Sequence, residues 1–129
     1  MNTLQRILYV EDDPDIQAIA QWVLEDMGGF NVRICSSGEE ALTVAPVFVP
    51  HLILLDVMMP GMDGLATFRA LRTLPGLQGV PVVFMTARVQ SHEVDDYRQQ
   101  GATGVISKPF DPMTLADQVR MLWKEHCHV

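Results

Sequence analysis

Five short runs of apolar residues recur along the chain, and their spacing constrains the fold more than any other feature. Neighbouring runs begin roughly 20 to 30 residues apart, and helical patterns of apolar residues lie between them. This alternation predicts five βα units, and therefore an α/β fold with a doubly wound, five-stranded parallel sheet in strand order 2-1-3-4-5. The expected strands are residues 7–10, 32–34, 52–55, 82–85 and 105–106.

The segments between these runs carry helix signals. Asp13 is a capping residue before a proline, and the pair Gly28-Gly29 ends the first helix where a positive φ is needed. The fourth segment has only Val94 and Tyr97 as large apolar residues, so little buried area holds that helix and it should shift easily. Helices are expected after Asp13 with one apolar stripe over residues 16–27, after Ser37, over residues 64–74 and 90–100, and after Asp111.

Length and composition restrict the class of protein. The 129 residues, 48% of them hydrophobic, fit one domain over residues 1–129. No apolar run approaches the roughly 18 residues of a membrane helix, and no secretory signal is evident, so the cytoplasm is expected. A net charge of −7 with nine Lys and Arg disfavours nucleic acid and anionic membranes, and favours proteins, as partners. Neither the two cysteines, Cys35 and Cys127, nor the four histidines have metal-ligand spacing, which indicates reduced thiols and ordinary surface or strand-edge histidines.

Polar residues follow the expected strands at the point where each strand ends. In a parallel sheet these ends share one edge, and the first and third strands are neighbours about 4.8 Å apart, so their acidic residues should meet in one pocket. Lys108 lies two strands from Asp56, about 10 Å at backbone level, and its long stem spans most of that gap. The residues concerned are Glu11, Asp12 and Asp13 after the first strand, Asp56 after the third, Thr86 after the fourth and Lys108 after the fifth.

Converging carboxylates at a strand edge need a cation. With oxygen ligands alone the expected ion is Mg²⁺, with Mn²⁺ as a substitute. Asp13 fits better as a helix cap, which leaves Glu11, Asp12 and Asp56 for the metal. A carboxylate oxygen can attack phosphorus when the cation bridges it to the phosphoryl oxygens and nearby donors take up the developing charge.

Each of these residues also has an ordinary interpretation when it is taken alone. Asp56 fits a turn-initiating aspartate before Pro-Gly, Thr86 a strand-end threonine and Lys108 an exposed lysine before a turn. Their combination with the acidic pair favours a phosphoryl site whose product is an aspartyl phosphate.

Four motifs in this order, ILYVEDDPDI, LILLDVMMPGMDG, FMTA and ISKPF, resemble the receiver domain of bacterial two-component response regulators, and the likeness covers nearly the whole chain. The resemblance implies a flavodoxin-like (βα)₅ three-layer sandwich and a signalling role rather than an enzymatic one. It implies that Asp56 accepts a phosphoryl group from a sensor histidine kinase or phosphotransfer protein. Glu11, Asp12 and the Met58 backbone carbonyl would help Asp56 to hold Mg²⁺, and Thr86 and Lys108 would contact the phosphoryl group.

The resemblance also implies a cis peptide between Lys108 and Pro109. One position departs from the family's pattern: Val105 stands three residues before the lysine, where the family usually has a tyrosine or phenylalanine. A valine cannot swing a ring, so we expect the response to consist of movement in the loop and helix after Thr86. The expected partner surface is the face formed by the fourth helix, fifth strand and fifth helix, in a monomer or a weak dimer formed on phosphorylation.

Three alternatives remain. A Mg²⁺-dependent phosphohydrolase of the haloacid dehalogenase type needs an acid two residues after its nucleophile, where this chain has Met58. A flavodoxin needs a Ser/Thr-rich phosphate loop after the first strand, and Glu11 to Asp13 would repel a phosphate. A degenerate receiver acting only as a scaffold conflicts with five intact site residues. The chain stops soon after the last expected helix, so no DNA-binding output module is expected within it.

Overall fold

The computed structural model describes residues 3–127 and contains the expected five-stranded parallel sheet in the order β2-β1-β3-β4-β5. His128, expected at the surface, lies outside the described residues. The strands are β1 Arg6–Val10, β2 Asn31–Cys35, β3 Leu52–Asp56, β4 Val82–Thr86 and β5 Gly104–Ser107. The helices are α1 Pro14–Trp22, the π-helical η1 Val23–Met27, α2 Gly38–Phe48, α3 Gly64–Leu71, α4 Ser91–Gln99 and α5 Leu115–Cys127.

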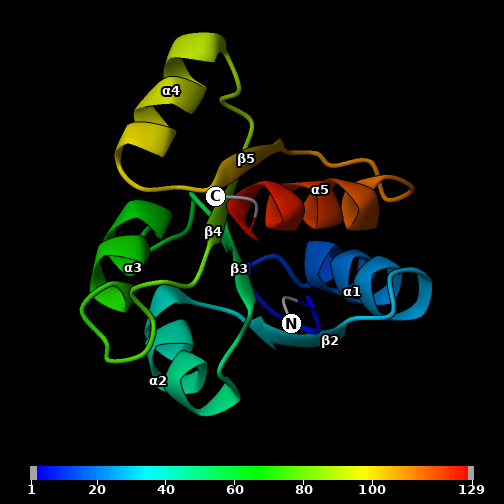
Figure 1. Ribbon diagram of the computed structural model, residues 1–129, viewed down its shortest axis with the longest axis horizontal. Helices are drawn as coiled ribbons and strands as arrows, with labels where there is room; N and C mark the ends of the chain where they lie inside the picture. Colours follow the sequence, from blue (N-terminus) through cyan, green and yellow to red (C-terminus); the bar gives the residue numbers. More distant parts are fainter. Residues whose placement is uncertain (1–2, 128–129) are drawn as a thin grey trace.

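The sheet separates two apolar cores. Helices α1 and α5 lie side by side over one face, and α2, α3 and α4 cover the other (Figure 1). Successive strand residues point to opposite faces, so Ile7 and Tyr9 enter the core under α1 and α5, while Leu8 and Val10 enter the other. The central strands β3 and β4 are buried along their whole length.

The first helix differs from the sequence prediction in its last turn. The chain leaves the regular α-helix at Trp22, and the Gly28 N–H donates to the carbonyl of Val23, five residues back, at 3.0 Å. This wider turn holds Val23 and Leu24 in the core, while Ile19 and Met27 remain 44% exposed. The predicted apolar stripe over residues 16–27 is therefore confirmed at Ile16, Ala20, Val23 and Leu24, and wrong at Ile19 and Met27.

Two other helix boundaries also differ. Helix α3 ends at Leu71 and not at residue 74, because residues 72–74 form a turn. Asp111 caps the last helical segment as expected, accepting from the Met113 N–H at 2.9 Å, but residues 112–114 form a turn before regular α5 begins at Leu115. Helix α4 has Tyr97 as its one buried residue, which agrees with its sparse apolar pattern.

Within residues 3–127 no helix has both the length and the apolar character needed to span a membrane.

Candidate functional site

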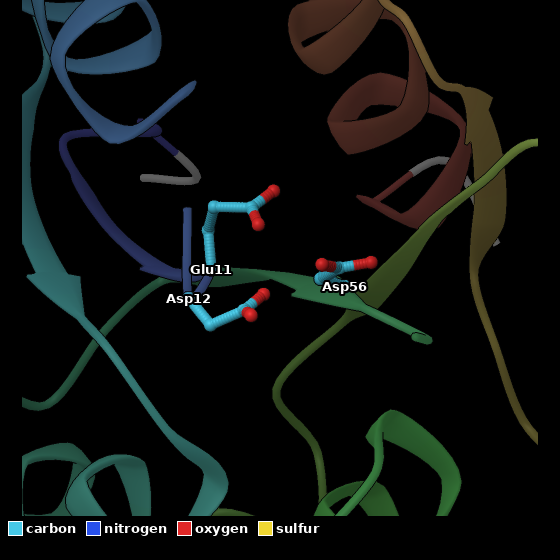
Figure 2. A group of neighbouring side chains, drawn as sticks. All are labelled: Glu11, Asp12 and Asp56. Carbon is cyan, nitrogen blue, oxygen red and sulfur yellow. The ribbon is translucent and has the colours of Figure 1, made fainter. Parts of the chain in front are cut away.

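The carboxyl edge of the sheet brings three carboxylates together. Asp56 is the last residue of β3 and is 2% exposed, while Glu11 and Asp12 directly follow β1 on the neighbouring strand. One oxygen from each of Glu11, Asp12 and Asp56 lies within 4.8 Å of the other two. Figure 2 shows the three side chains converging from the two strand ends. Glu11 is also buried, whereas Asp12 is exposed to solvent.

Lys108 enters this cluster from the end of β5. Its Nζ donates to Asp56 Oδ2 at 3.1 Å and to Glu11 Oε1 at 2.8 Å. Partial burial alone would lower the pKa of Lys108, but the hydrogen bonds and negative charge of Glu11 and Asp56 outweigh it and raise that pKa. The ammonium therefore stays charged and acts as the internal counterion of the two buried carboxylates. The peptide between Lys108 and Pro109 is cis, as the resemblance implied.

The ion pair between Lys108 and Glu11 was not expected from the sequence, and neither was a contact from Tyr9. The buried Tyr9 hydroxyl donates to Glu11 Oε1 at 3.3 Å. Burial, followed by the charges of Glu11 and Asp56, raises the pKa of Tyr9, so the phenol keeps its proton and remains a donor. The signal that was available is the spacing: residues 9 and 11 lie on the same face of an extended strand.

The remaining expected residues lie around the carboxylates. The Met58 N–H donates to Asp56 Oδ1 at 3.2 Å, and the Met58 side chain is 70% exposed. Thr86, at the end of the adjacent strand β4, is buried, and its Oγ1 accepts from the Arg88 N–H at 3.1 Å. Asp13 caps α1, accepting from the Asp15 N–H at 2.9 Å, which agrees with its interpretation as a cap.

Gly64 allows the loop after β3 to return closely to the site. A Cβ at this position would lie 2.4 Å from the carbonyl oxygen of Asp56, and the Gly64 N–H donates to the Val57 carbonyl at 3.0 Å. Any side chain here would push α3 away from the end of β3. The glycine at the end of the PGMDG stretch thus holds the start of α3 against the strand that carries Asp56.

The donor set fits a hard divalent cation. The cluster offers carboxylate oxygens from Glu11, Asp12 and Asp56, with no imidazole or thiolate among its members. Oxygen ligands of this kind suit Mg²⁺ and Mn²⁺ and give no preference to zinc or copper. Lys108 supplies one positive charge against three carboxylates, so a second cation is electrostatically favourable.

Comparisons with known proteins agree with this geometry. Residues 7–120 match the family model of the response regulator receiver domain. The DNA-binding response regulator MtrA of Mycolicibacterium smegmatis is 39% identical over 121 residues, which is 93% of this chain and 51% of that protein. Response regulator Rre1 of Synechocystis sp. is 37% identical over 116 residues, or 90% of this chain and 50% of that protein. The chain thus spans about half the length of these curated relatives.

Solved structures extend the comparison to the fold. The chemotaxis protein CheY4 of Vibrio cholerae superposes with a TM-score of 0.84 at 28% sequence identity, covering 93% of this chain and 99% of that one. A response regulator from Desulfuromonas acetoxidans gives a TM-score of 0.82 at 27% identity, covering 94% and 98%.

Proposed function

The chain belongs to the family of response regulator receiver domains of two-component systems, and we propose that Asp56 is its phosphoacceptor. The observation that carries the proposal is the environment of this carboxylate. Asp56 is 2% exposed, lies in a cluster with two further acids, and has Lys108 Nζ 3.1 Å from its Oδ2. A buried nucleophilic carboxylate next to both a cation site and an ammonium has the components that phosphoryl transfer requires.

The metal site in this proposal comprises Glu11, Asp12 and Asp56, together with the backbone carbonyl of Met58. The fit of the oxygen donors supports Mg²⁺, with Mn²⁺ as a substitute. When bound, the ion lowers the repulsion between the attacking carboxylate and the phosphoryl oxygens. Receiver domains bind Mg²⁺ generally, and the acidic cluster is compatible with that property.

The chemical step is a displacement at phosphorus. An oxygen of Asp56 forms the new P–O bond, and the bond from phosphorus to the donor, a histidine nitrogen or an acyl oxygen, breaks with its electron pair on the donor. Lys108 moves with the incoming charge from the Asp56 carboxylate to a phosphoryl oxygen, and the Thr86 hydroxyl donates to another. In this proposal the chain acts as a signalling phosphoacceptor. Besides accepting the phosphoryl group from its donor protein, it at most phosphorylates itself from small donors and dephosphorylates itself.

The phosphodonor in this proposal is a sensor histidine kinase or a phosphotransfer protein, and the cytoplasm is the compartment. The donor must approach over the carboxyl edge of the sheet, because Asp56 ends β3 at this edge. A small apolar cleft of about 110 Å³ adjoins Lys108 at this edge and offers contact area for that protein. Its other lining residues are Ile16, Ile19, Pro109, Phe110 and Pro112.

The readout surface in this proposal is the face of α4, β5 and α5. Helix α4 is held by the single buried residue Tyr97, so its displacement costs little. A downstream protein, or a second copy in a weak dimer formed on phosphorylation, would bind this face. The haloacid dehalogenase alternative is not favoured, because the exposed Met58 occupies the position of its second acid.

The test is labelling of the whole chain with acetyl phosphate and Mg²⁺, followed by intact-mass spectrometry. We expect one added phosphate that hydroxylamine removes, as it does from acyl phosphates, and no label on Asp56→Asn. Asp63→Asn is the matched control, because Asp63 lies in the same loop and caps α3 through the Ala66 N–H at 2.8 Å. Undiminished, metal-dependent labelling of Asp56→Asn would exclude Asp56 as the acceptor.

A further inference from the structure

The Glu11 carboxylate is held by three donors of different kinds. Its Oε1 accepts from Lys108 Nζ at 2.8 Å and from the Tyr9 hydroxyl at 3.3 Å, and its Oε2 accepts from the Asp13 N–H at 3.2 Å. Lys108 has a long side chain with several rotatable bonds, and the Asp13 N–H belongs to the backbone. Tyr9 is therefore the one rigid side chain that fixes the direction of the Glu11 carboxylate.

The Tyr9 ring is held in place by the residues packed around it. It is fully buried in the core under α1 and α5, one residue before the end of β1, where it is paired with Ile34 on one side and Leu54 on the other. A phenol in such a place needs a partner for its hydroxyl, and the Glu11 carboxylate two residues further along the same strand face provides it. The backbone of β1 and the residue that follows it thus fix the positions of both Tyr9 and Glu11.

We propose that Tyr9 is a positioning residue for the metal site, holding Glu11 so that its carboxylate faces the cation beside Asp56. This proposal rests on the proposed function. Lys108 holds Glu11 in the resting protein, but it is also the group that must follow an incoming phosphoryl charge. When Lys108 leaves Glu11, the Tyr9 hydroxyl and the Asp13 N–H are the donors that keep the carboxylate in place.

Loss of the hydroxyl should weaken metal binding for two reasons. Without it, the Glu11 carboxylate can turn about its side-chain torsions, and orientation by such outer hydrogen bonds is commonly important for metal affinity. In addition, Lys108 becomes the only donor to Glu11 Oε1 among residues 3–127, so the cation must compete with a tighter ion pair. Both effects raise the dissociation constant for Mg²⁺.

The experiment compares Mg²⁺ binding to the wild-type chain, Tyr9→Phe and Tyr97→Phe by amide chemical-shift titration. Tyr9→Phe keeps the buried ring and removes only the hydroxyl, and we expect it to raise the Mg²⁺ dissociation constant about five- to tenfold. Tyr97→Phe is the matched control, since Tyr97 is the chain's other tyrosine and has no hydrogen bond to the acidic cluster. The Mg²⁺ dissociation constant of Tyr97→Phe should stay within about twofold of the wild-type value.

A double-mutant cycle separates positioning from a merely structural role. In a Glu11→Ala background no carboxylate remains to be positioned, so Tyr9→Phe should change the Mg²⁺ dissociation constant less than about twofold. Urea unfolding in EDTA checks that each variant is folded. The proposal is overturned if Tyr9→Phe binds Mg²⁺ within twofold of wild type, or if it weakens binding equally with and without Glu11.

Failure of this inference is distinguishable from failure of the proposed function. If Asp56→Asn still takes up the label, the phosphoacceptor assignment fails. The ratio of the Mg²⁺ dissociation constants of Tyr9→Phe and wild type does not depend on that result. If wild type is labelled at Asp56 and binds Mg²⁺ but Tyr9→Phe binds it equally well, only the positioning role fails.

Discussion

Replacing Lys108 by methionine tests whether one ammonium holds the resting site together. The substitution keeps most of the side-chain length and apolar contact while removing the charge. It leaves Glu11 and Asp56, which are 1% and 2% exposed, without their counterion. Asp12 adds a third carboxylate within 4.8 Å of both. The expected result is a marked loss of stability when no divalent cation is present.

The magnitude follows from the two ion-pair distances. At an effective dielectric constant of about 20, Coulomb's law gives about 6 kcal/mol of attraction at 2.8 Å and about 5 kcal/mol at 3.1 Å. Desolvation of the three groups offsets much of this attraction, and removing one partner of a buried pair typically costs about 3–5 kcal/mol. The Lys108 side chain is 19% exposed, so water screens it in part and we expect the lower end, about 3 kcal/mol.

The assay is urea unfolding followed by circular dichroism, in EDTA and in saturating Mg²⁺. In saturating Mg²⁺ a cation bound at the proposed site would supply the missing charge, so the deficit of Lys108→Met should fall to about 1 kcal/mol. Lys124→Met is the matched control, because this exposed lysine has no ion pair within the described part of the chain and should change stability by less than about 0.5 kcal/mol. A Lys108→Met variant as stable as wild type in EDTA refutes the counterion argument, and a deficit that Mg²⁺ leaves unchanged refutes the charge-balance explanation.

Two further predictions concern other parts of the fold. His51 Nδ1 accepts from the N–H groups of Gln5 and Arg6 at 3.1 and 3.0 Å, and burial, followed by the Arg6 charge, lowers the pKa of His51. As the pH falls, His51 therefore takes up a proton in the unfolded chain before it does so in the folded one. Its contribution to the free energy of unfolding should be fully present above about pH 6.5 and decline below it. In urea unfolding at several pH values, His51→Gln should flatten that decline. Adding beryllofluoride, which imitates the phosphoryl group, should change amide chemical shifts mainly at residues 86–108. In the proposed function Thr86 and Lys108 would draw β4 and β5 toward Asp56, and α4 would follow because Tyr97 is its one buried residue. Changes concentrated on α2 and α3 instead would contradict this mode of readout.

The grouping of the acidic residues could be predicted because it depends on topology alone. Once the strand order places β1 beside β3, residues that directly follow the two strands must share an edge of the sheet. The backbone topology places these residues together whatever the directions of their side chains. The strand order itself followed from five βα repeats, and the apolar residues of the strands are buried except for Ile34 and Val105, which are half-buried.

The partners of Glu11 could not be predicted in the same way. Whether Lys108 reaches Glu11 as well as Asp56 depends on side-chain torsions, and backbone spacing limits these without choosing among them. The turn at η1 was missed for a related reason. The apolar stripe continues with the same period through Met27. This pattern does not indicate that the Val23 carbonyl accepts a hydrogen bond from the N–H of Gly28, five residues ahead.

The charge balance of the site explains why a buried strand ends in a carboxylate. Three carboxylates against one ammonium leave two formal negative charges at the end of β1 and β3. A fully compensated cluster would be more stable and would have no reason to take up a cation. In the proposed function, one divalent ion held by these carboxylates would close this balance. The phosphoryl group would then bring about two further negative charges, and Lys108 would be the residue that meets them. The uncompensated negative charge of the resting site would thus be the source of its affinity for the ion.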